Sequence, residues 1–471
     1  MPDLLLTNGH VLCLDASGAQ YAPGYVAVEG GRISAVGPQS QAPKSAAEVI
    51  DCAGCAVIPG LINCHTHLPM VYFRGLADDL PLNQWLTEYI FPAEAQHLNP
   101  QFCHDATLLA AAECIRAGVT CVNDMYLFAG SVAAALDEAG LRGLVGEGVI
   151  SFPTSSAPDW HAGLALAEEL EKNYTGHPRI MPTFCAHAPY TCDIELLTTL
   201  HSRARELGRP FHIHLHEAED EAGRVNWLMP EESPTYGLYR IGALSEACIC
   251  AHCVWLRQNE VRLLAKAGAS VAHCPESNLK LASGVAPLLS MLNAGVDVGV
   301  GTDGAASNNN LDLLAEARLA SLLAKGAVPS VAVTGSAGGP AREDVADTAA
   351  RPTTLYEGPR SRAANAVPAR TALELATRRA AATLKQADIG TLAPGLRADI
   401  AVVDLSAAHL TPRFRHAEAL YSHLVYAAEA GDVRDTIVEG RVLMRQRQLL
   451  TLDEPRIRSK AQAWADASYP K

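Results

Sequence analysis

The chain has 471 residues, of which 49% are hydrophobic, so it can bury a sizeable core and still form a smaller second unit. Its 51 acidic and 37 basic side chains give a net charge of −14, which argues against a nucleic-acid partner. No stretch is apolar for long enough to span a bilayer, and the first residues do not resemble a signal peptide, so we expect a cytoplasmic protein without a membrane partner.

The 13 cysteines are an odd number scattered over a long chain, which argues against a disulfide framework. The pairs Cys52/Cys55 and Cys250/Cys253 lie too far apart in the sequence to form a zinc ribbon together. Both pairs lie in apolar, strand-like surroundings, where cysteine serves as a small hydrophobic side chain. We therefore predict that these cysteines are structural and bind no metal.

Short strands separated by turns are predicted for residues 1–57, with a hairpin at Gly30-Gly31. From about residue 57, strands and helices alternate. Eight strands are predicted, at residues 57–63, 119–124, 142–150, 179–188, 210–216, 248–254, 270–274 and 296–303. Helices are predicted at residues 103–117, 132–139, 162–172, 194–207, 260–267, 286–293 and 311–323. Eight alternating strands favour a closed parallel barrel over an open sheet.

Residues 328–366 are rich in small and turn-forming residues and predict a loop insertion, which is more typical of a surface excursion than of a lid. Helical periodicity returns at 369–384, and strands are predicted at 389–392, 399–403, 433–438 and 441–444. We therefore predict an α/β fold: a (β/α)8 TIM barrel over residues 58–387 and a small composite β-sandwich domain formed by both chain ends, 1–57 and 388–471.

Polar residues that can bind a metal follow the predicted barrel strands at their carboxyl ends. They are His65, His187, His214, His252 and Asp303. In a barrel of this type the catalytic groups gather at that face. Neutral imidazoles with a carboxylate suit zinc or iron(II), so the pattern predicts a metal that activates water.

Two histidine-rich strand ends leave alternatives open. His65 and His67 lie two residues apart and share a face, which suits two ligands of one metal but also fits a polar cluster. Three histidines, His212, His214 and His216, repeat that spacing. The first would lie deepest in the barrel and form a structural hydrogen bond, and the spacing does not choose between the other two as the third ligand.

Proton-transfer groups are also present at these strand ends. Glu217 would lie near the metal as a proton shuttle, unless it is only an acid at the start of a helix. Asp303 can complete the metal shell and accept a proton from the activated water, and the alternative is a helix cap.

The segment Pro59-Gly60-Leu61-Ile62-Asn63-Cys64-His65-Thr66-His67 resembles the opening motif of the amidohydrolase superfamily. Residues 390–400 resemble its return into the β-domain. Within the superfamily the chain is similar to the 5′-methylthioadenosine/S-adenosylhomocysteine deaminases. This similarity rests on residues 70–94, 277–284 and 301–310, and it covers nearly the whole chain apart from the insertion.

The resemblance implies roles for individual residues. The metal ligands would be His65, His67, His214 and Asp303, holding one divalent ion per subunit, zinc or alternatively iron. The family's catalytic Glu follows the third His by three residues, which selects His214 and makes Glu217 the proton shuttle. His252 would orient the water. The substrate would contact Glu94, through its ribose hydroxyls, and His187, Glu217, Trp85 and Ser307.

The implied reaction is the hydrolytic deamination of adenine nucleosides to the inosine analogue and ammonia, by an aminohydrolase acting on C–N bonds of cyclic amidines. Asp303 and His252 would help to deprotonate the water, while Glu217 protonates the ring nitrogen beside the amino-bearing carbon. The substrates implied are 5′-methylthioadenosine, S-adenosylhomocysteine and adenosine. We also expect a homo-oligomer, a dimer or a tetramer.

Two alternatives share parts of this pattern. One is a deaminase or chlorohydrolase of another ring, such as guanine, cytosine or an s-triazine, for which a ribose-binding Glu94 has no purpose. The other is a non-catalytic metal-binding protein, against which Glu217 and His252 argue. Between Val149 and Ala162 the chain lacks the Arg that some relatives offer to the amino-acid tail of S-adenosylhomocysteine, so the sequence does not rank the nucleosides.

Overall fold

The computed structural model describes residues 1–326, 364–414, 416 and 418–469. Eight parallel strands form a barrel: β6 (Leu61–Thr66), β7 (Val119–Tyr126), β8 (Arg142–Val149), β10 (Phe184–Ala186), β11 (Phe211–Leu215), β12 (Cys248–His252), β13 (Ser270–His273) and β14 (Val298–Val300). A further short strand, β9 (Ile180–Pro182), pairs with β8. Every residue of the eight strands is buried, which explains why their sequences are mostly apolar and do not alternate with exposed polar residues. The predicted TIM barrel is confirmed.

The last barrel strand returns to the first just beyond its end. The Asp303 amide donates to the His65 carbonyl at 2.9 Å, and the Asn63 amide group donates to the Thr302 hydroxyl at 2.8 Å. These bonds close the barrel at its carboxyl end. They also place the segment after β14 directly beside the histidines of β6.

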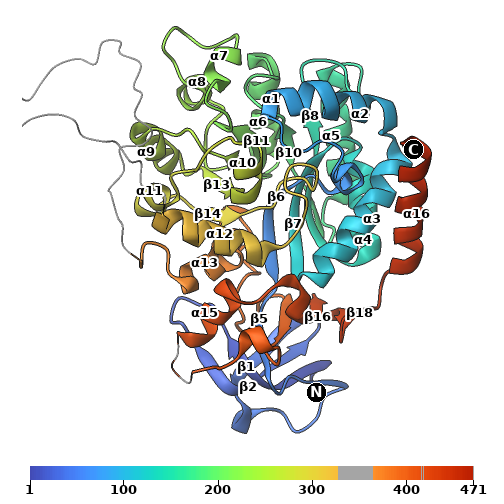
Figure 1. The fold of residues 1–471 in the computed structure, drawn as a ribbon, viewed down its shortest axis with the longest axis vertical. Helices are drawn as coiled ribbons and strands as arrows, with labels where there is room; N and C mark the ends of the chain where they lie inside the picture. Colours follow the sequence, from blue (N-terminus) through green and yellow to red (C-terminus); the bar gives the residue numbers. More distant parts are fainter. Residues whose placement is uncertain (327–363, 415, 417, 470–471) are drawn as a thin grey trace, which may run out of the picture.

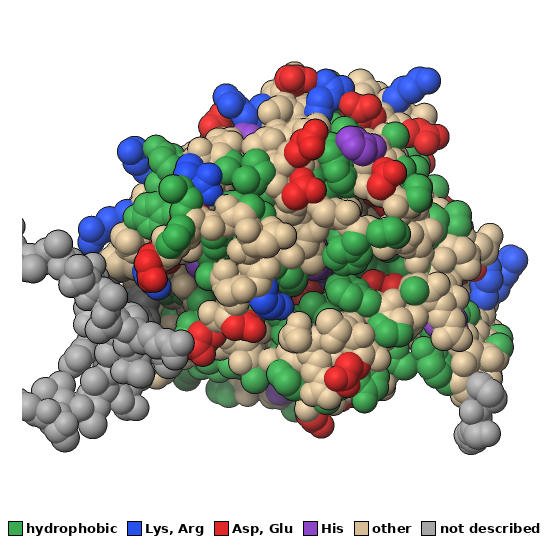
Figure 2. All heavy atoms as spheres, turned by 90° about the horizontal axis from the view of Figure 1, so that it is seen from above, with side chains coloured by type: hydrophobic (Ala, Val, Ile, Leu, Met, Phe, Trp, Pro, Cys, Tyr) green, Lys and Arg blue, Asp and Glu red, His purple; other side chains and the backbone are tan. Residues whose placement is uncertain are grey.

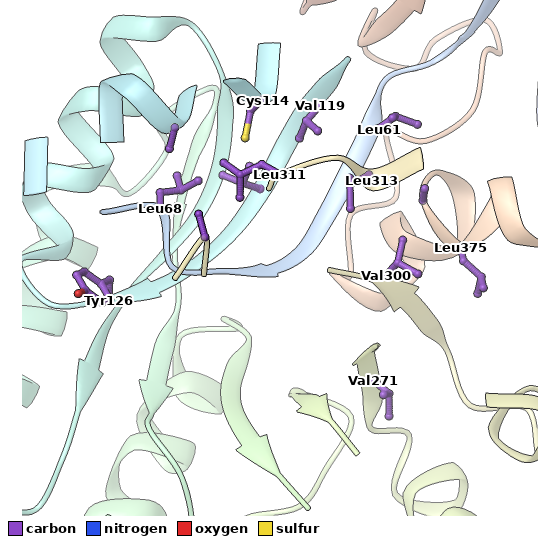
Figure 3. Packing of buried hydrophobic residues seen from close by; sticks show 14 of the residues in the cluster. Leu61, Leu68, Cys114, Val119, Tyr126, Val271, Val300, Leu311, Leu313 and Leu375 are labelled. Atoms are coloured by element: carbon purple, nitrogen blue, oxygen red, sulfur yellow. The ribbon is translucent and has the colours of Figure 1, made fainter. Parts of the chain in front are cut away.

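Helices pack around the barrel wall: α3 (Pro100–Arg116), α4 (Ala129–Ala139), α5 (Trp160–Tyr174), α6 (Ile194–Glu206), α9 (Gln258–Ala267), α11 (Leu288–Asn293), α12 (Leu313–Gly326), α13 (Ala369–Leu375) and α14 (Arg378–Thr383). Side chains of Asn99, Asp159 and Asp193 cap the amino ends of α3, α5 and α6. Figure 3 shows the core between wall and helices, with Val271 and Val300 on neighbouring strands and Leu375 on α13.

One predicted helix, at residues 369–384, is two helices in the structure. The break falls at Ala376, whose carbonyl accepts a hydrogen bond from the Ile62 amide of β6 at 2.8 Å. A carbonyl engaged by a barrel strand is withdrawn from the helical pattern, so the helix ends there.

The two chain ends share one sheet, as predicted. Its strands are β1 (Leu4–Leu12), β2 (Gln20–Glu29), β3 (Arg32–Pro38), β4 (Glu48–Asp51), β5 (Cys55–Pro59), β15 (Ile400–Asp404), β16 (Val433–Val438), β17 (Arg441–Arg445) and β18 (Gln448–Leu449). The antiparallel pair β5 and β15 joins the two halves. The sheet curls around one core, because Ile33 of β3 and Ile437 of β16 belong to the same buried cluster. The exact domain limits stay a prediction.

Gly60 is the junction between the two sheets. The predicted strand at 57–63 divides there into β5 and β6, because the Gly60 amide donates to the Asp399 carbonyl at 2.9 Å. A Cβ atom at this position would lie only 2.2 Å from the Thr120 side chain, so the close approach of the backbone requires glycine.

The structure corrects and extends the predictions for the tail. Residues 389–391 form a bend and Leu392 lies in irregular structure, so there is no strand here, and the Leu392 amide donates to the Cys13 carbonyl outside any ladder. Two helices were not predicted, α15 (Ala419–Tyr426) and α16 (Glu454–Ser468). Two short 3₁₀ turns, η4 (Ala408–Leu410) and η5 (Ala430–Asp432), also lie in the described part of the tail, and a third, η1 (Gln39–Gln41), follows β3 at the other chain end. The predicted insertion at 328–366 lies almost entirely outside the described residues.

Short helical segments cover the carboxyl end of the barrel, opposite the composite domain (Figure 1). Four of them follow β6: η2 (Leu68–Phe73), α1 (Leu82–Gln84), the π-helical turn η3 (Trp85–Ile90) and α2 (Phe91–His97). The others are α7 (Glu221–Arg224), α8 (Pro234–Arg240) and α10 (Pro275–Lys280). Figure 2 looks down on this end and shows hydrophobic side chains gathered there. Among the described residues, no helix is long and apolar enough to cross a membrane.

Candidate metal and substrate site

Four side-chain atoms converge at the carboxyl end of the barrel. The Nε2 atom of His214 lies 3.2 Å from that of His65 and 3.3 Å from that of His67. Oδ1 of Asp303 lies 3.3 and 3.2 Å from the same two nitrogens of His65 and His67. Four ligands at about 2.1 Å from a tetrahedral zinc ion would lie about 3.4 Å apart. The spacing therefore fits one small metal ion.

The Nδ1 atoms of two of these rings form hydrogen bonds, which determines which ring nitrogen carries the proton. Nδ1 of His67 donates to the Met125 carbonyl, and Nδ1 of His214 donates to the His187 carbonyl at 2.7 Å. A carbonyl only accepts, so in the neutral rings both Nε2 atoms carry lone pairs directed at the cluster. Burial lowers the pKa of His65 to about 3 and that of His214 well below its usual value, which favours the neutral form that binds metals.

The deepest histidine, His212, holds a ligand ring and does not join the cluster. Its Nε2 lies 3.1 Å from Nδ1 of His65, and its Nδ1 lies 3.2 Å from the Asn123 amide nitrogen. This is the structural hydrogen bonding predicted for His212. His216 points away, with its Nε2 3.4 Å from Oε1 of Glu260, so of these two histidines it is His214 that faces the cluster.

Asp303 is aimed by its neighbours. Its Oδ2 accepts hydrogen bonds from the hydroxyls of Ser277 at 2.6 Å and Ser307 at 2.8 Å, which leaves Oδ1 for the cluster. Its backbone adopts a φ of +60°, a strained left-handed conformation for a residue other than glycine. Such strain persists where surrounding contacts enforce it, commonly at functional sites.

His252 lies beside the cluster and faces Glu217. Its Nδ1 is 2.9 Å from Oδ1 of Asn278, and its Nε2 is 3.8 Å from Oε2 of Glu217. Candidate ligand atoms of His65, His214, His252 and Asp303 also lie within 4.8 Å of one another. His67 approaches His214 to 3.3 Å and Asp303 to 3.2 Å, so we expect His252 to be a neighbour of a bound ion and not a ligand.

Glu217 is buried at the same end, where it can hold a proton. Burial raises the pKa of its carboxyl group to about 7, although nearby His252 opposes the rise. The Glu217 amide donates to Oε2 of Glu221 at 2.9 Å, which fixes the turn after β11. A carboxylic acid that titrates near neutrality is suited to proton transfer.

A cavity of about 340 Å³ opens from this cluster toward the covering segments. Glu94 of α2 lines it and accepts a hydrogen bond from the Tyr126 hydroxyl at 2.7 Å. Burial raises the pKa of Glu94 to about 7, and the hydrogen bond from Tyr126 opposes the rise. The other end is apolar, with the rings of Phe91 and Phe152 6.3 Å apart. No Lys or Arg is among the described residues that line the cavity.

The other residues that were predicted to contact the substrate differ in whether they line the cavity. Trp85 and His187 line the cavity, and burial lowers the pKa of His187 to about 3. Ser307 does not belong to the lining, because its hydroxyl is turned to Asp303. The geometry therefore favours a role for Ser307 in holding that carboxylate over a contact with substrate.

Several residues of the site were not predicted: Ser277, Asn278, Tyr126, Phe91 and Phe152. The first two lie in a segment that carries the family resemblance, so a signal for their importance was present but not for their partners. Phe91 also lies in such a segment, residues 70–94, whereas Tyr126 and Phe152 show no local pattern that distinguishes them from core residues.

The donor set fits a borderline divalent metal. Three imidazole nitrogens and one carboxylate oxygen, from the buried His65, His214 and Asp303 and the partly buried His67, are ligands typical of zinc and also suit iron(II). The Glu217 carboxyl group does not belong to this donor set, so it is free for proton transfer. The structure thus joins a buried His/Asp metal site with an acid group and a mostly apolar cavity.

Comparisons with known proteins agree with this geometry. The model of the family described as "Amidohydrolase family" matches residues 56–443. The protein named 5-methylthioadenosine/S-adenosylhomocysteine deaminase of Syntrophobacter fumaroxidans is 42% identical over 96% of this chain and 95% of its own length.

Solved structures show the same relationship. An adenosine deaminase from Xanthomonas campestris with bound zinc is 36% identical, with a TM-score of 0.88 over 99% of this chain and 98% of its own. Atrazine chlorohydrolase TrzN from Arthrobacter aurescens TC1, complexed with zinc, has a TM-score of 0.84 over 98% of this chain and 99% of its own. At 22% identity, that second likeness shows the fold alone. The chain belongs to the amidohydrolase family and is a hydrolytic, metal-dependent aminohydrolase.

Proposed function

We propose that the protein deaminates adenine nucleosides, namely 5′-methylthioadenosine, S-adenosylhomocysteine and adenosine, to the inosine analogue and ammonia. The observation that carries this proposal is the Glu94 carboxylate, which lines the same cavity as the His/Asp cluster and Glu217. The names of the relative from Syntrophobacter fumaroxidans and of the adenosine deaminase from Xanthomonas campestris support the same substrate class.

The proposed ion is zinc, held by His65, His67, His214 and Asp303, with iron(II) as the alternative. When bound, such an ion lowers the pKa of water and so supplies a nucleophile near neutral pH. The protein's part is to hold the three rings and the carboxylate in place through Met125, His187, His212, Ser277 and Ser307.

Glu217 is the proposed proton shuttle. With its pKa raised by burial it holds a proton that it can give to the ring nitrogen beside the amino-bearing carbon, which makes that carbon electrophilic. Asp303 accepts a proton from the attacking water, and His252 orients that water. The ring of His252 is itself fixed by the Asn278 side chain, whose Oδ1 lies 2.9 Å from its Nδ1. A second proton transfer to the amino group lets ammonia leave.

Glu94 is the proposed ribose ligand. A carboxylate can accept two hydrogen bonds from the adjacent hydroxyls of ribose, and the Tyr126 hydroxyl fixes one of its oxygens. His187 and Trp85 line the same cavity and would contact the nucleoside. Guanine, cytosine and s-triazines have no such diol, so Glu94 argues against the alternative substrates.

A panel assay tests the proposal. Ammonia release is measured with methylthioadenosine, S-adenosylhomocysteine, adenosine, guanine, cytosine and a chlorotriazine, and the bound metal is quantified on the same sample. We expect turnover with the nucleosides and about one zinc ion per chain. Activity confined to the free bases or the triazine would overturn the proposal. The expected dimer or tetramer stays a prediction, to be tested by light scattering.

A further inference from the structure

The C-terminal helix α16 lies on the outside of the barrel against α3 (Figure 1). None of its residues is fully buried, and most of its side chains face solvent. Arg116 of α3 pairs with Glu454, and Asp105 of α3 pairs with Lys460. Partly exposed ion pairs of this kind stabilise little, so another contact must hold the helix.

Trp464 supplies that contact. Its ring stacks on Tyr72, with centroids 5.0 Å apart and planes at 30°, and meets Phe102 of α3 edge-on at 5.1 Å. It also meets the ring of His97 edge-on at 5.4 Å. Aromatic pairs at these distances contribute beyond the area they bury, so Trp464 is the main attachment of α16.

Two of these partners belong to the segments that cover the cavity. Tyr72 lies in η2, two residues after Met70, and His97 ends α2, three residues after Glu94. Met70 and Glu94 both line the cavity. Trp464 therefore touches the outer side of the two short elements whose inner side faces the substrate.

The helix that carries Glu94 needs such support. It has seven residues, follows a π-helical turn, and buries only Ala93 fully. Helices this short are marginal without tertiary contacts. On the inner side, the Ser155 hydroxyl donates to the Glu94 carbonyl at 2.9 Å, but the end of the helix at His97 packs on the ring of Trp464.

We propose that Trp464 is a positioning residue for Glu94, so that the C-terminal helix takes part in nucleoside recognition from outside the cavity. This inference rests on the proposed function, because it assigns the ribose hydroxyls to Glu94. His97 also meets the ring of Tyr469 at 5.6 Å, so loss of the Trp464 ring loosens the end of α2 without releasing it, and lets the Glu94 carboxylate drift from the ribose.

The test compares three variants of the full-length, metal-loaded protein. Trp464→Ala removes the ring, Trp464→Phe keeps an aromatic side chain, and Gln462→Ala alters an exposed residue of the same helix. For each variant, kcat and KM are measured with adenosine and with 2′,3′-dideoxyadenosine, which lacks the hydroxyls, together with zinc content and Tm.

For Trp464→Ala we expect KM for adenosine to rise about tenfold, the effect of a weakened charged hydrogen bond, with kcat and zinc content nearly unchanged. The values for 2′,3′-dideoxyadenosine should stay near those of the wild type. Trp464→Phe should restore most of the preference for adenosine, and Gln462→Ala should behave as wild type.

An equal loss with both nucleosides, or an unchanged preference for adenosine in an active Trp464→Ala variant, would overturn the inference. A wild-type protein that releases ammonia from no adenine nucleoside, methylthioadenosine and S-adenosylhomocysteine included, would overturn the proposed function, and the inference with it. The two failures are therefore distinguished by the wild-type protein alone.

Discussion

The two ends of the cavity are built in different ways. At the inner end the polar groups stand on or just after barrel strands, and each has a second partner that fixes it: a carbonyl for His67 and His214, two hydroxyls for Asp303, an amide for His252. The outer end is made by short helices and by the loop after β8, where Phe152 is 43% exposed.

Chemistry and selectivity are thus divided between the two ends of the cavity. Rigid strand ends hold groups to the precision that catalysis needs. Surface segments with few buried contacts can vary, and they set what enters. Substitutions at the inner end should therefore alter the reaction rate with every substrate, whereas substitutions farther out should alter the preference among substrates.

The largest effect is expected for Glu217→Gln. The amide keeps the shape of the side chain but cannot shuttle a proton, so kcat should fall by about a thousandfold or more with every nucleoside. The metal content, measured by atomic absorption, should stay at the wild-type level because Glu217 is not a proposed ligand. Ammonia release near the wild-type rate would contradict the role assigned to Glu217.

An intermediate effect is expected for Glu94→Ala, which lies between the two ends. Loss of charged hydrogen bonds to the ribose should lower kcat/KM for nucleosides by about 10- to 100-fold and change little with free adenine. Steady-state assays with adenosine and adenine measure the difference. Equal losses for both compounds would remove the ribose contact from the proposal.

The inner end could be predicted from the sequence to a large extent. The apolar strands are regular, and a barrel brings their carboxyl ends together, so His65, His214, His252 and Asp303 could be grouped although far apart in the chain. The choice between His214 and His216 could not be made from spacing. It depends on the left-handed backbone of His216, with a φ of +52°, which turns that ring toward Glu260.

The supporting contacts and the outer end could not be predicted, because they depend on pairs that only the fold brings together. Ser277 lies 26 residues before Asp303, and nothing in either segment announces their hydrogen bond. Trp464 contacts Tyr72 across most of the chain. The helices after β6 are short, and one is a π-helical turn, so they have little periodicity to detect.

The smallest effect is expected at the mouth, for Phe152→Ala. In the proposed binding mode, with the purine at the metal cluster and the ribose at Glu94, we expect the 5′ substituent to extend toward Phe91 and Phe152, which line the same cavity. A methylthio group packs on these rings and gains about 0.8 kcal/mol for each buried carbon, so the variant should lose about fourfold in kcat/KM for methylthioadenosine and little for adenosine. The ratio of the two substrates, measured in competition, isolates the outer end from the inner one. A uniform loss would mean that Phe152 supports the cluster itself, and the division between the two ends would no longer hold.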